Sequence, residues 1–398
     1  MKDALYFRIY ETIAAQITGG QLPPGAQIPT EMEITELYAT SRITASRAVR
    51  ELEQRGYVYR VRARGTFVNE PSKWQAASDQ SNEHDRGLIS IVFPSPVSGI
   101  SLNVEVLQGA ETASSALGYT LSVTSVKTHD DPTTRKPLDI EKDLIAQVID
   151  RGAQGAIIYP YSSRGSAEIY NRMTIRGFPF VLVDRRVLAV DAPGVASDNR
   201  GGFRSVVEHL IAAGHRRIAF VSGNTFASSS RADRFAGFID AMNAHRIEVN
   251  DDYIVHDLIP FDYNKVFFDP QITGNDTLHR SIKAMLERFI AMRHRPTAIC
   301  ATNDYIALSM LTIAAECGIR VPQDLSITGF DNLSVCTLFK PRLTTVAQSF
   351  RKMGEEAVRL LHALIRDPQR RRQSIALPTT LVEGDSVGES NQSEPIAP

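Results

Sequence analysis

Arginine side chains gather in one short stretch of this 398-residue chain. From position 42 to position 64 there are seven arginines and two glutamates, a local net charge of 7 − 2 = +5, whereas the formal net charge of the whole chain is −1. The arginines are Arg42, Arg47, Arg50, Arg55, Arg60, Arg62 and Arg64. A small positive surface on a nearly neutral protein is typical of a site that meets the phosphates of nucleic acid.

A second group of polar residues follows apolar runs that are typical of buried strands. Its members are Asp184, Arg185, Asn303, Asp331 and Gln348, together with Arg234, which is expected early in the helix after the strand that ends near Gly223. Asp184, for example, directly follows Phe-Val-Leu-Val, and Asp331 follows Ile-Thr-Gly-Phe. Each residue alone is equally consistent with a helix cap or a surface charge. Together they supply acceptors, amides and guanidinium groups, which suit a ligand rich in hydroxyls because each hydroxyl both donates and accepts.

Common nucleotide-binding and metal-binding motifs are missing from the sequence. It contains no Gly-x-Gly-x-x-Gly, Gly-x-x-x-x-Gly-Lys-Ser/Thr, His-x-x-x-His or Cys-x-x-Cys. Cys300, Cys317 and Cys336 are widely spaced, and we expect reduced core thiols. Asp184 and Asp331 could form the carboxylate pair of a glycosidase, but strand-end positions favour ligand hydrogen bonding. We therefore predict no enzyme, no catalytic residue, no metal and no cofactor.

Composition is that of a soluble protein with two or three domains, since 43% of the residues are hydrophobic and 22% are charged. No apolar run is long enough to cross a bilayer. The N-terminus carries Lys2 and Asp3 and has no apolar segment followed by small residues, so it does not resemble a secretory signal. A cytoplasmic protein without membrane contact is expected.

The elements that position the arginines form a compact pattern. A helix is expected over 5–19, before a Gly- and Pro-rich turn. Thr30 and Glu33 make a capping box for a second helix. Ser41 is the expected N-cap of a third helix, which ends at Gly56. Two short strands, 57–61 and 66–68, follow. This order predicts a winged helix-turn-helix over residues 1–69. The polar stretch 70–87 is interpreted as a linker, in which the packing of Trp74 is left open.

Beyond the linker the sequence alternates between strands and helices. Apolar runs occur at 88–93, 119–124, 155–159, 179–183, 217–222, 298–302 and 325–330, and helical segments at 103–117, 138–151, 199–213, 230–245, 276–292, 304–317 and 350–366. Such alternation predicts an α/β fold of two lobes, each a doubly wound parallel sheet, over residues 88–388, with a flexible tail at 389–398. Ligands of open α/β sheets bind beyond the carboxyl ends of the strands, where the second polar group is expected to lie.

Two family resemblances follow from longer motifs. Residues 5–68 resemble the GntR-type winged-helix domain, through Leu-Pro-Pro-Gly at 22–25, Ser-Arg-Ile-Thr-Ala-Ser-Arg-Ala at 41–48 and Arg-Gly-Thr-Phe-Val at 64–68. Residues 87–387 resemble the effector domain of LacI/GalR repressors, which is similar to periplasmic sugar-binding proteins, through Asp-Asn-Arg-Gly-Gly at 198–202, Thr-Asn-Asp at 302–304 and Gly-Phe-Asp at 329–331. The combination resembles the arabinose-repressor subgroup of bacterial regulators.

These resemblances imply roles for individual residues. The DNA-binding positions are Thr30, Glu31, Arg42, Thr44, Ser46, Arg47, Arg64, Gly65 and Thr66. Arg42 and Arg47 can form forked hydrogen bonds to guanine or phosphate, whereas Arg50 and Arg55 are expected to be solvated or packed against acids. The effector-binding positions are Asp184, Arg185, Arg234, Asn303, Asp331 and Gln348, with further contacts from the loop 98–103.

Four departures from the family patterns stand out. Thr40 replaces an apolar residue before Ser-Arg, and the segment 381–386 lacks the arginine usual before its final serine. The aromatic stretch 256–277 is longer than the pattern requires; a surface insertion is the favoured interpretation, ahead of a lid or a dimer element. The hinge helix of LacI is replaced by the polar linker, so ligand and DNA binding need not be coupled as they are in LacI.

The sequence therefore predicts a homodimeric, sequence-specific regulator whose affinity for double-stranded operator DNA changes with a small effector. Repression of carbohydrate-metabolism genes, released by a sugar, is the favoured hypothesis. A nucleoside or another metabolite as effector, or activation in place of repression, stays open, and a carbohydrate-acting enzyme is a remote alternative. A transport binding protein needs an export signal, and an architectural DNA binder does not need so large a ligand-binding body.

Overall fold

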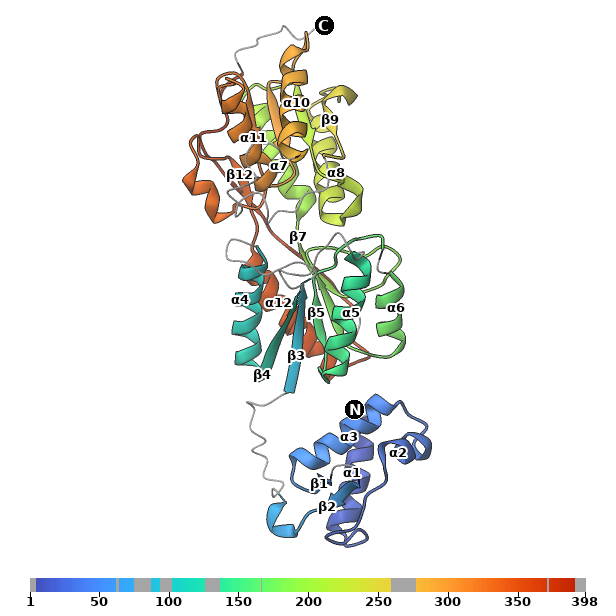
Figure 1. Ribbon diagram of the computed structural model, residues 1–398. Helices are drawn as coiled ribbons and strands as arrows, with labels where there is room; N and C mark the ends of the chain where they lie inside the picture. The colour runs from blue at the N-terminus through green and yellow to red at the C-terminus, as the bar shows by residue number, and fades with distance from the viewer. Residues whose placement is uncertain are drawn as a thin grey trace. The chain divides into compact units, whose positions relative to one another are not determined.

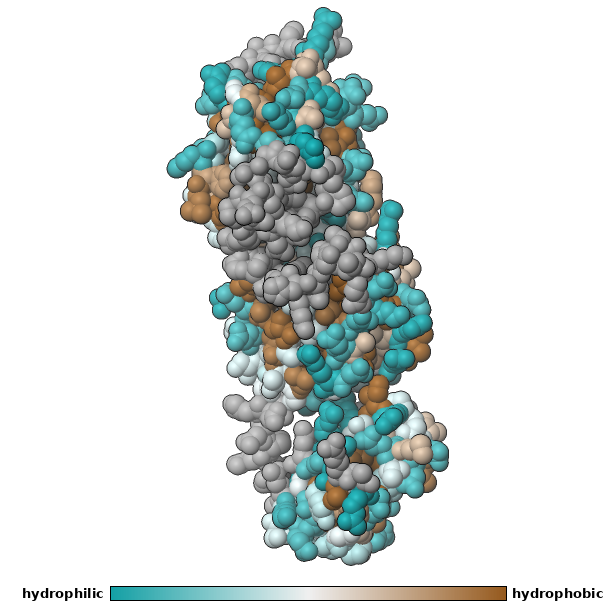
Figure 2. Space-filling view, viewed as in Figure 1, coloured by the Kyte–Doolittle hydropathy of each residue, from teal (hydrophilic) through white to brown (hydrophobic). Residues whose placement is uncertain are grey.

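The computed structural model describes residues 5–61, 64–74, 87–93, 102–125, 137–165, 167–258, 277–370 and 372–390. The chain divides into two compact units, Met1–Glu83 and His84–Pro398, which we call the head and the body. Within the described ranges, no helix is long and apolar enough to cross a membrane. On the face drawn in Figure 2, hydrophobic residues form small patches among hydrophilic ones, which is ordinary for a protein surface in water.

The head is a winged helix-turn-helix, as predicted. It contains α1 (Leu5–Thr18), α2 (Glu31–Leu37), α3 (Arg42–Gln54) and an antiparallel wing of β1 (Val58–Val61) and β2 (Gly65–Val68) (Figure 1). Ile9, Ile13 and Ile17 line one side of α1 and are buried against α2, α3 and the wing. This spacing of four residues keeps the three side chains on one face of the helix, which explains why α1 packs as it does.

Both predicted helix caps in the head are confirmed. The Thr30 hydroxyl accepts from the Glu33 amide at 3.3 Å, and the Glu33 carboxylate accepts from the Thr30 amide at 2.8 Å. The Ser41 hydroxyl accepts from the Thr44 amide at 3.3 Å and begins α3. Each cap satisfies backbone amides that have no partner within the helix.

The interpretation of residues 70–87 as a linker was wrong at its start. A short 3-10 helix, η1 (Pro71–Lys73), follows the wing, and Trp74 packs against Tyr57 with ring centroids 5.9 Å apart. The Trp74 indole donates to the Asn69 carbonyl at 3.0 Å. Packing of the only tryptophan, which is half-buried, therefore attaches residues 70–74 to the head, although most of these residues are polar.

The first lobe of the body is built on a six-stranded sheet in the order β13-β7-β6-β5-β3-β4, with parallel pairings throughout. The strands are β3 (Gly87–Phe93), β4 (Tyr119–Ser125), β5 (Ala156–Ile158), β6 (Phe180–Val183), β7 (Gly194–Ser197) and β13 (Ser374–Leu377). Helices α4 (Leu102–Ala116) and α12 (Phe350–Arg366) cover one face, and α5 (Pro137–Asp150) and α6 (Ala167–Ile175) cover the other (Figure 1).

Alternate residues of these strands enter opposite cores. Ile157 packs under α4 and α12, whereas Ala156 and Ile158 pack under α5 and α6. Because side chains alternate across a strand, a sheet covered on both faces needs continuous apolar runs. This requirement is why β3, β5 and β6 were visible in the sequence.

The second lobe repeats the plan around a four-stranded sheet in the order β11-β10-β8-β9. The strands are β8 (Ile218–Val221), β9 (Ile254–Val255), β10 (Ala298–Ala301) and β11 (Ser326–Thr328). One face packs against α7 (Asn199–Ala212) and α8 (Ser229–Ala244), and the other against α10 (Thr277–Ala291) and α11 (Asp304–Glu316). Short 3-10 helices lie at Thr225–Ala227 (η2), Asp251–Tyr253 (η3) and Ser334–Leu338 (η4).

The chain passes between the lobes three times. It crosses from β7 to α7, from β12 (Thr345–Ala347) to α12, and from β13 to β14 (Thr380–Val382), and β12 and β14 pair antiparallel. Two of the crossings are joined, since the Asp198 amide donates to the Leu377 carbonyl at 2.7 Å. Gln348 lies at another crossing, directly after β12.

The fold class predicted from the sequence is confirmed, but the crossings were not foreseen. The sequence analysis did not assign α6, β7, β9, β13 or β14. The missed strands are two to four residues long, and several include glycine, serine or threonine. Their pairing partners are remote in the chain, so local hydrophobic patterning carries little signal for them.

Candidate functional site

Arg42, one of the arginines expected to bind DNA, is largely exposed. It is the first residue of α3, directly after the Ser41 cap, and its side chain is 86% exposed. Ile43 beside it is also exposed, while the Thr44 hydroxyl lies 2.9 Å from that of Ser41 and belongs to the cap. The start of α3 thus presents a guanidinium and an apolar side chain, groups that can read guanine and the thymine methyl respectively.

Glu31 lies among arginines in the head. Its carboxylate accepts from Arg60 of β1 at 3.2 Å and lies 3.9 Å from the Arg42 guanidinium. Arg60 also donates to Glu53 of α3 at 3.1 Å. Arg60 therefore connects the wing to α2 and α3 through ion pairs. The Glu31 carboxylate is in a position to orient these arginines rather than to contact phosphate itself.

Arg47 and Arg55 are stacked on tyrosines of α1. The Arg47 guanidinium lies 3.8 Å from the Tyr6 ring centroid, and Arg55 lies 4.8 Å from that of Tyr10. Arg55 also donates to Glu51 at 2.7 Å, as expected of an arginine packed against an acid. Ser46, directly before Arg47 in the sequence, is half-buried on α3.

The described part of the wing tip contains Arg64, which is exposed, and Gly65, whose φ is +123°. The Gln27 side chain donates to the Arg64 carbonyl at 3.4 Å. A side chain at position 65 would both strain the backbone and collide with Gln27. The Thr66 carbonyl accepts from the Ile28 amide at 3.0 Å, so the wing is fastened to the chain that precedes α2. Residues 62 and 63 lie outside the described ranges.

In the body, Arg234 is the centre of the second-lobe part of the expected effector site. Its side chain is only 5% exposed and lies 3.9 Å from the Phe330 ring centroid. It donates to the Asn199 side chain at 2.8 Å and to the Thr302 carbonyl at 2.5 Å, and pairs with the Asp331 carboxyl at 3.3 Å. A buried guanidinium that lies against an aromatic ring and whose N–H groups meet three acceptors is held in one orientation.

Asp331 and Gln348 complete this group. The Gln348 amide donates to Asp331 at 2.6 Å, which leaves the buried carbonyl oxygen of Gln348 without a hydrogen-bond partner in the described structure. Burial raises the pKa of Asp331 to about 8; Arg234 opposes that rise, and the nearby carboxyls of Asp304 and Asp184 add to it. Asn303, expected here too, accepts from the Ile306 amide at 2.9 Å as the N-cap of α11.

Asp184 and Arg185 form the first-lobe part, directly after β6. The Tyr159 hydroxyl donates to the Asp184 carboxylate at 2.7 Å, and Arg185 lies 3.3 Å from the same oxygen. Arg185 also donates to the carbonyls of Pro160 and Tyr161 at 3.2 and 2.9 Å. Burial is the first cause of a strongly raised pKa at Tyr159, so this hydroxyl stays protonated and remains a donor.

The structure brings the two parts of the expected effector set together. The charges of Asp184 and Asp331 act on one another, and that of Asp331 acts on Tyr159, although these residues belong to different lobes. Sequence reasoning missed Tyr159, Asn199 and Phe330. Tyr159 follows the apolar run of β5 as Asp184 follows that of β6, and this parallel was the available signal.

A separate set of contacts joins the lobes beside this site. Arg186 donates two hydrogen bonds to Asp233, at 2.9 and 2.8 Å, and its amide donates to the Ser229 hydroxyl at 2.8 Å. The Ser229 amide donates to the Ser163 hydroxyl at 2.7 Å, and the Ser163 amide donates to the Ala227 carbonyl at 3.0 Å. These residues come from loops of the first lobe and, in the second lobe, from η2 and the first turns of α8.

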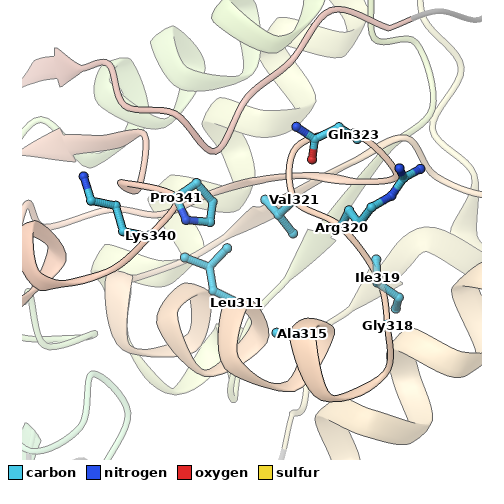
Figure 3. Close-up of a pocket in the computed structure, with 9 residues that line it drawn as sticks. All are labelled: Leu311, Ala315, Gly318, Ile319, Arg320, Val321, Gln323, Lys340 and Pro341. Atoms are coloured by element: carbon cyan, nitrogen blue, oxygen red, sulfur yellow. The ribbon is translucent and has the colours of Figure 1, made fainter.

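Other expected positions lie elsewhere. Of the loop 98–103, residues 98–101 are outside the described ranges, and Asn103 is buried in α4. Of the segment 256–277, positions 259–276 are outside them as well. A surface cavity of about 430 Å³, lined by Leu311, Arg320 and Lys340 among others, contains no residue of the effector set (Figure 3). The described residues form no cluster of three potential metal ligands.

Comparison with known proteins agrees with both units. Residues 5–68 match the family model of the gntR family of bacterial regulatory proteins. Residues 89–257 match the model of periplasmic binding proteins and the sugar-binding domain of the LacI family. Residues 207–387 match the model of a periplasmic binding protein-like domain. The body resembles the solved structure of a LacI-type regulator from Bacillus cereus, with 25% sequence identity and a TM-score of 0.61 over 77% of this chain and 100% of that one. It also resembles a LacI family regulator from Enterococcus faecium with bound ribose, with 21% identity and a TM-score of 0.60 over 76% of this chain and 100% of that one.

Two relatives share both units over most of their length. The arabinose metabolism transcriptional repressor of Geobacillus stearothermophilus is 29% identical over 369 residues, 90% of this chain and 91% of that protein. The protein of the same name from Halalkalibacterium halodurans is 25% identical and covers 99% of this chain and 100% of its own. The chain therefore belongs to the bacterial transcriptional repressors that join a GntR-family winged helix-turn-helix to a LacI-type, periplasmic-binding-protein-like effector domain.

Proposed function

We propose that this repressor is released from its operator by an uncharged monosaccharide bound between the lobes of the body. The observation that carries the proposal is the convergence of Asp184 and Tyr159 from one lobe with Arg234, Asp331 and Gln348 from the other. Carboxyl and amide oxygens accept from sugar hydroxyls, and guanidinium and amide groups donate to them. The relatives named for arabinose metabolism make arabinose the first effector to test.

The charges of the site favour a neutral effector over a phosphate ester. Arg234 is committed to Asn199, Thr302 and Asp331, and Arg185 to Asp184 and two backbone carbonyls. A phosphate has to displace these internal acceptors while it approaches the buried Asp184 carboxylate. That approach costs desolvation and repulsion, which hydroxyl groups avoid.

For the DNA side, we propose that a homodimer places two heads on a pseudo-palindromic operator, since the symmetry of protein and DNA then match. Arg42, Arg47 and Arg64 supply contacts to bases or phosphates, and Thr30, Thr44, Ser46, Gly65 and Thr66 surround them. Effector binding shifts the body to a form that holds the heads at an unsuitable spacing. By linkage, operator DNA weakens effector binding by the same factor.

The test combines operator selection with release. Purified protein is used to select binding sites from fragments of its own genome, and fluorescence anisotropy on the selected duplex is repeated with arabinose, other aldopentoses, hexoses, their phosphates and nucleosides. We expect one free sugar to lower operator affinity and to raise the melting temperature. Release by a sugar phosphate or by a nucleoside alone contradicts the neutral-sugar proposal, and failure to select any site contradicts the DNA-binding assignment.

A further inference from the structure

Asp304 is a fully buried carboxyl that stands directly behind the effector set. It is the first residue of α11, where a carboxylate ordinarily serves the amides at the helix start. Here the Asn303 side chain already caps the helix by accepting from the Ile306 amide. The two oxygens of Asp304 are directed to other segments, Oδ2 to the loop that follows β11 and Oδ1 to β12.

Three hydrogen bonds run from that loop and from β12 to Asp304. The Leu333 amide donates at 2.8 Å, the Cys336 thiol at 3.3 Å and the Thr345 hydroxyl at 2.5 Å. A fourth contact runs the other way, because the Asp304 amide donates to the Phe330 carbonyl at 2.8 Å. The carboxyl also lies against Gly329, where a Cβ would collide with it.

The segment held in this way contains an unfavourable turn. Asp331 has a φ of +122° and Asn332 a φ of +52°, and two consecutive residues with side chains rarely adopt positive φ. The Thr345 hydroxyl that donates to Asp304 also accepts from the Asn332 amide at 3.4 Å. Such backbone strain persists only where surrounding contacts impose it, and it is concentrated at functional sites.

We propose that Asp304 is a positioning residue of the effector site: with Thr345, it holds the turn at 331–332 so that the Asp331 carboxyl faces Arg234 and Gln348. The inference rests on the proposed function, because Asp331 is the effector-binding group that it serves. Asp304 itself meets no effector, since both of its oxygens are used within the protein.

A purely structural role predicts a different result from a positioning role. If Asp304 only stabilised α11, its replacement would loosen the first turn of that helix and lower operator and effector affinity together. If it positions Asp331, its replacement loosens residues 331–336 and lowers effector affinity selectively. Both quantities can be measured on the full-length protein.

The first experiment is hydrogen exchange, which needs no effector. Asp304→Asn keeps the size of the side chain but replaces one acceptor oxygen by an amide donor, which then faces either the Leu333 amide or the Thr345 hydroxyl. We expect faster exchange at the Asn332 and Leu333 amides and unchanged exchange across α11. The reverse pattern, with α11 loosened and the turn protected, would overturn the proposal.

The second experiment measures affinity for whichever monosaccharide of the panel above gives the largest thermal shift. Thr345→Val removes the bridging hydroxyl at nearly constant volume, and Thr345→Ser keeps it. We expect Thr345→Val and Asp304→Asn to weaken sugar binding about tenfold or more, operator affinity to stay within about twofold, and Thr345→Ser to bind the sugar as the parent protein does. Equal sugar affinity in the Val and Ser variants contradicts the proposal.

The two experiments separate this inference from the function on which it rests. If no sugar of the panel binds the parent protein, the proposed effector class fails, while the exchange experiment still decides whether Asp304 holds the turn. Should Asp304→Asn fail to fold, Thr345→Val carries both measurements, because it leaves the carboxyl and the helix cap in place.

Discussion

Single side chains in this repressor carry distinct charges and environments that can be tested one at a time. Asp331 is a buried acid whose pKa lies above that of an exposed aspartate, and Arg42 is a basic side chain that is largely exposed. The protonation of Asp331 affects the stability of the protein, whereas the exposed guanidinium of Arg42 affects DNA binding because it can extend to a base or a phosphate.

At the residue scale, the elevated pKa of Asp331 predicts how stability depends on pH. The unfolded chain ionises this carboxyl near its ordinary pKa, whereas the folded protein keeps it protonated up to about pH 8. The contribution of this group is therefore fully present below about pH 4 and is lost as pH rises toward 8. Asp331→Asn has no such titration, so its melting temperature relative to the parent protein should rise between pH 5 and pH 8. Parallel melting curves across that range would contradict the assignment.

Also at the residue scale, Arg42→Ala should weaken operator binding by roughly 1–3 kcal/mol if the side chain reads a base, with effector affinity and melting temperature unchanged. Arg55→Ala is the control. Because Arg55 pairs with Glu51 and stacks on Tyr10, its loss should lower the stability of the head and leave operator affinity nearly intact. Binding titrations at several salt concentrations distinguish a base contact from a phosphate contact, which alone changes the salt dependence. Equal losses of operator affinity in the two variants would refute this division.

At the scale of elements, the contact between α4 and α12 depends on two glycines. A Cβ at Gly109 would collide with the Arg351 carbonyl, and one at Gly354 would collide with the Val106 carbonyl. The two helices approach closely because each presents bare backbone to the other. Gly354→Ala should therefore destabilise the body by roughly 1–3 kcal/mol, measured by urea unfolding. Glu111→Ala, on an exposed position of α4, is the control and should change stability little. A stable Gly354→Ala protein would mean that the helices can separate without cost.

At the scale of the whole body, the contacts of Arg186 with Asp233 and Ser229 bind one lobe to the other without using the effector set. They stabilise the form in which the two halves of the site meet. Asp233→Arg should weaken effector binding about three- to tenfold, because the effector then has to supply the closure free energy itself. The exchange Arg186→Asp with Asp233→Arg should recover most of that affinity, as titration calorimetry can measure. Failure of the exchange to recover affinity, with both proteins folded, would show that the pair does not stabilise closure.

The sequence by itself determined the architecture. Continuous apolar runs predicted the principal strands of both sheets, helical periodicity predicted most of the helices between them, and the capping residues Thr30 and Ser41 marked helix starts that the structure confirms. These features were readable because each depends on neighbours in the chain: a strand covered on both faces must be apolar, and a cap must lie beside the amides that it satisfies.

The tertiary structure alone decided how the effector residues are connected. Asp184, Arg234 and Asp331 were visible as polar residues near strand ends. Nothing in the neighbouring sequence indicated that Tyr159 donates a hydrogen bond to Asp184 or that Arg185 donates to backbone carbonyls. Nor did it indicate that the Leu333 amide, next to the turn at Asp331, donates to Asp304. The short crossing strands were missed for the same reason. Their pairing partners and those of the buried polar groups lie far away in the sequence, so the free energy that fixes them comes from contacts that form only when the lobes are assembled.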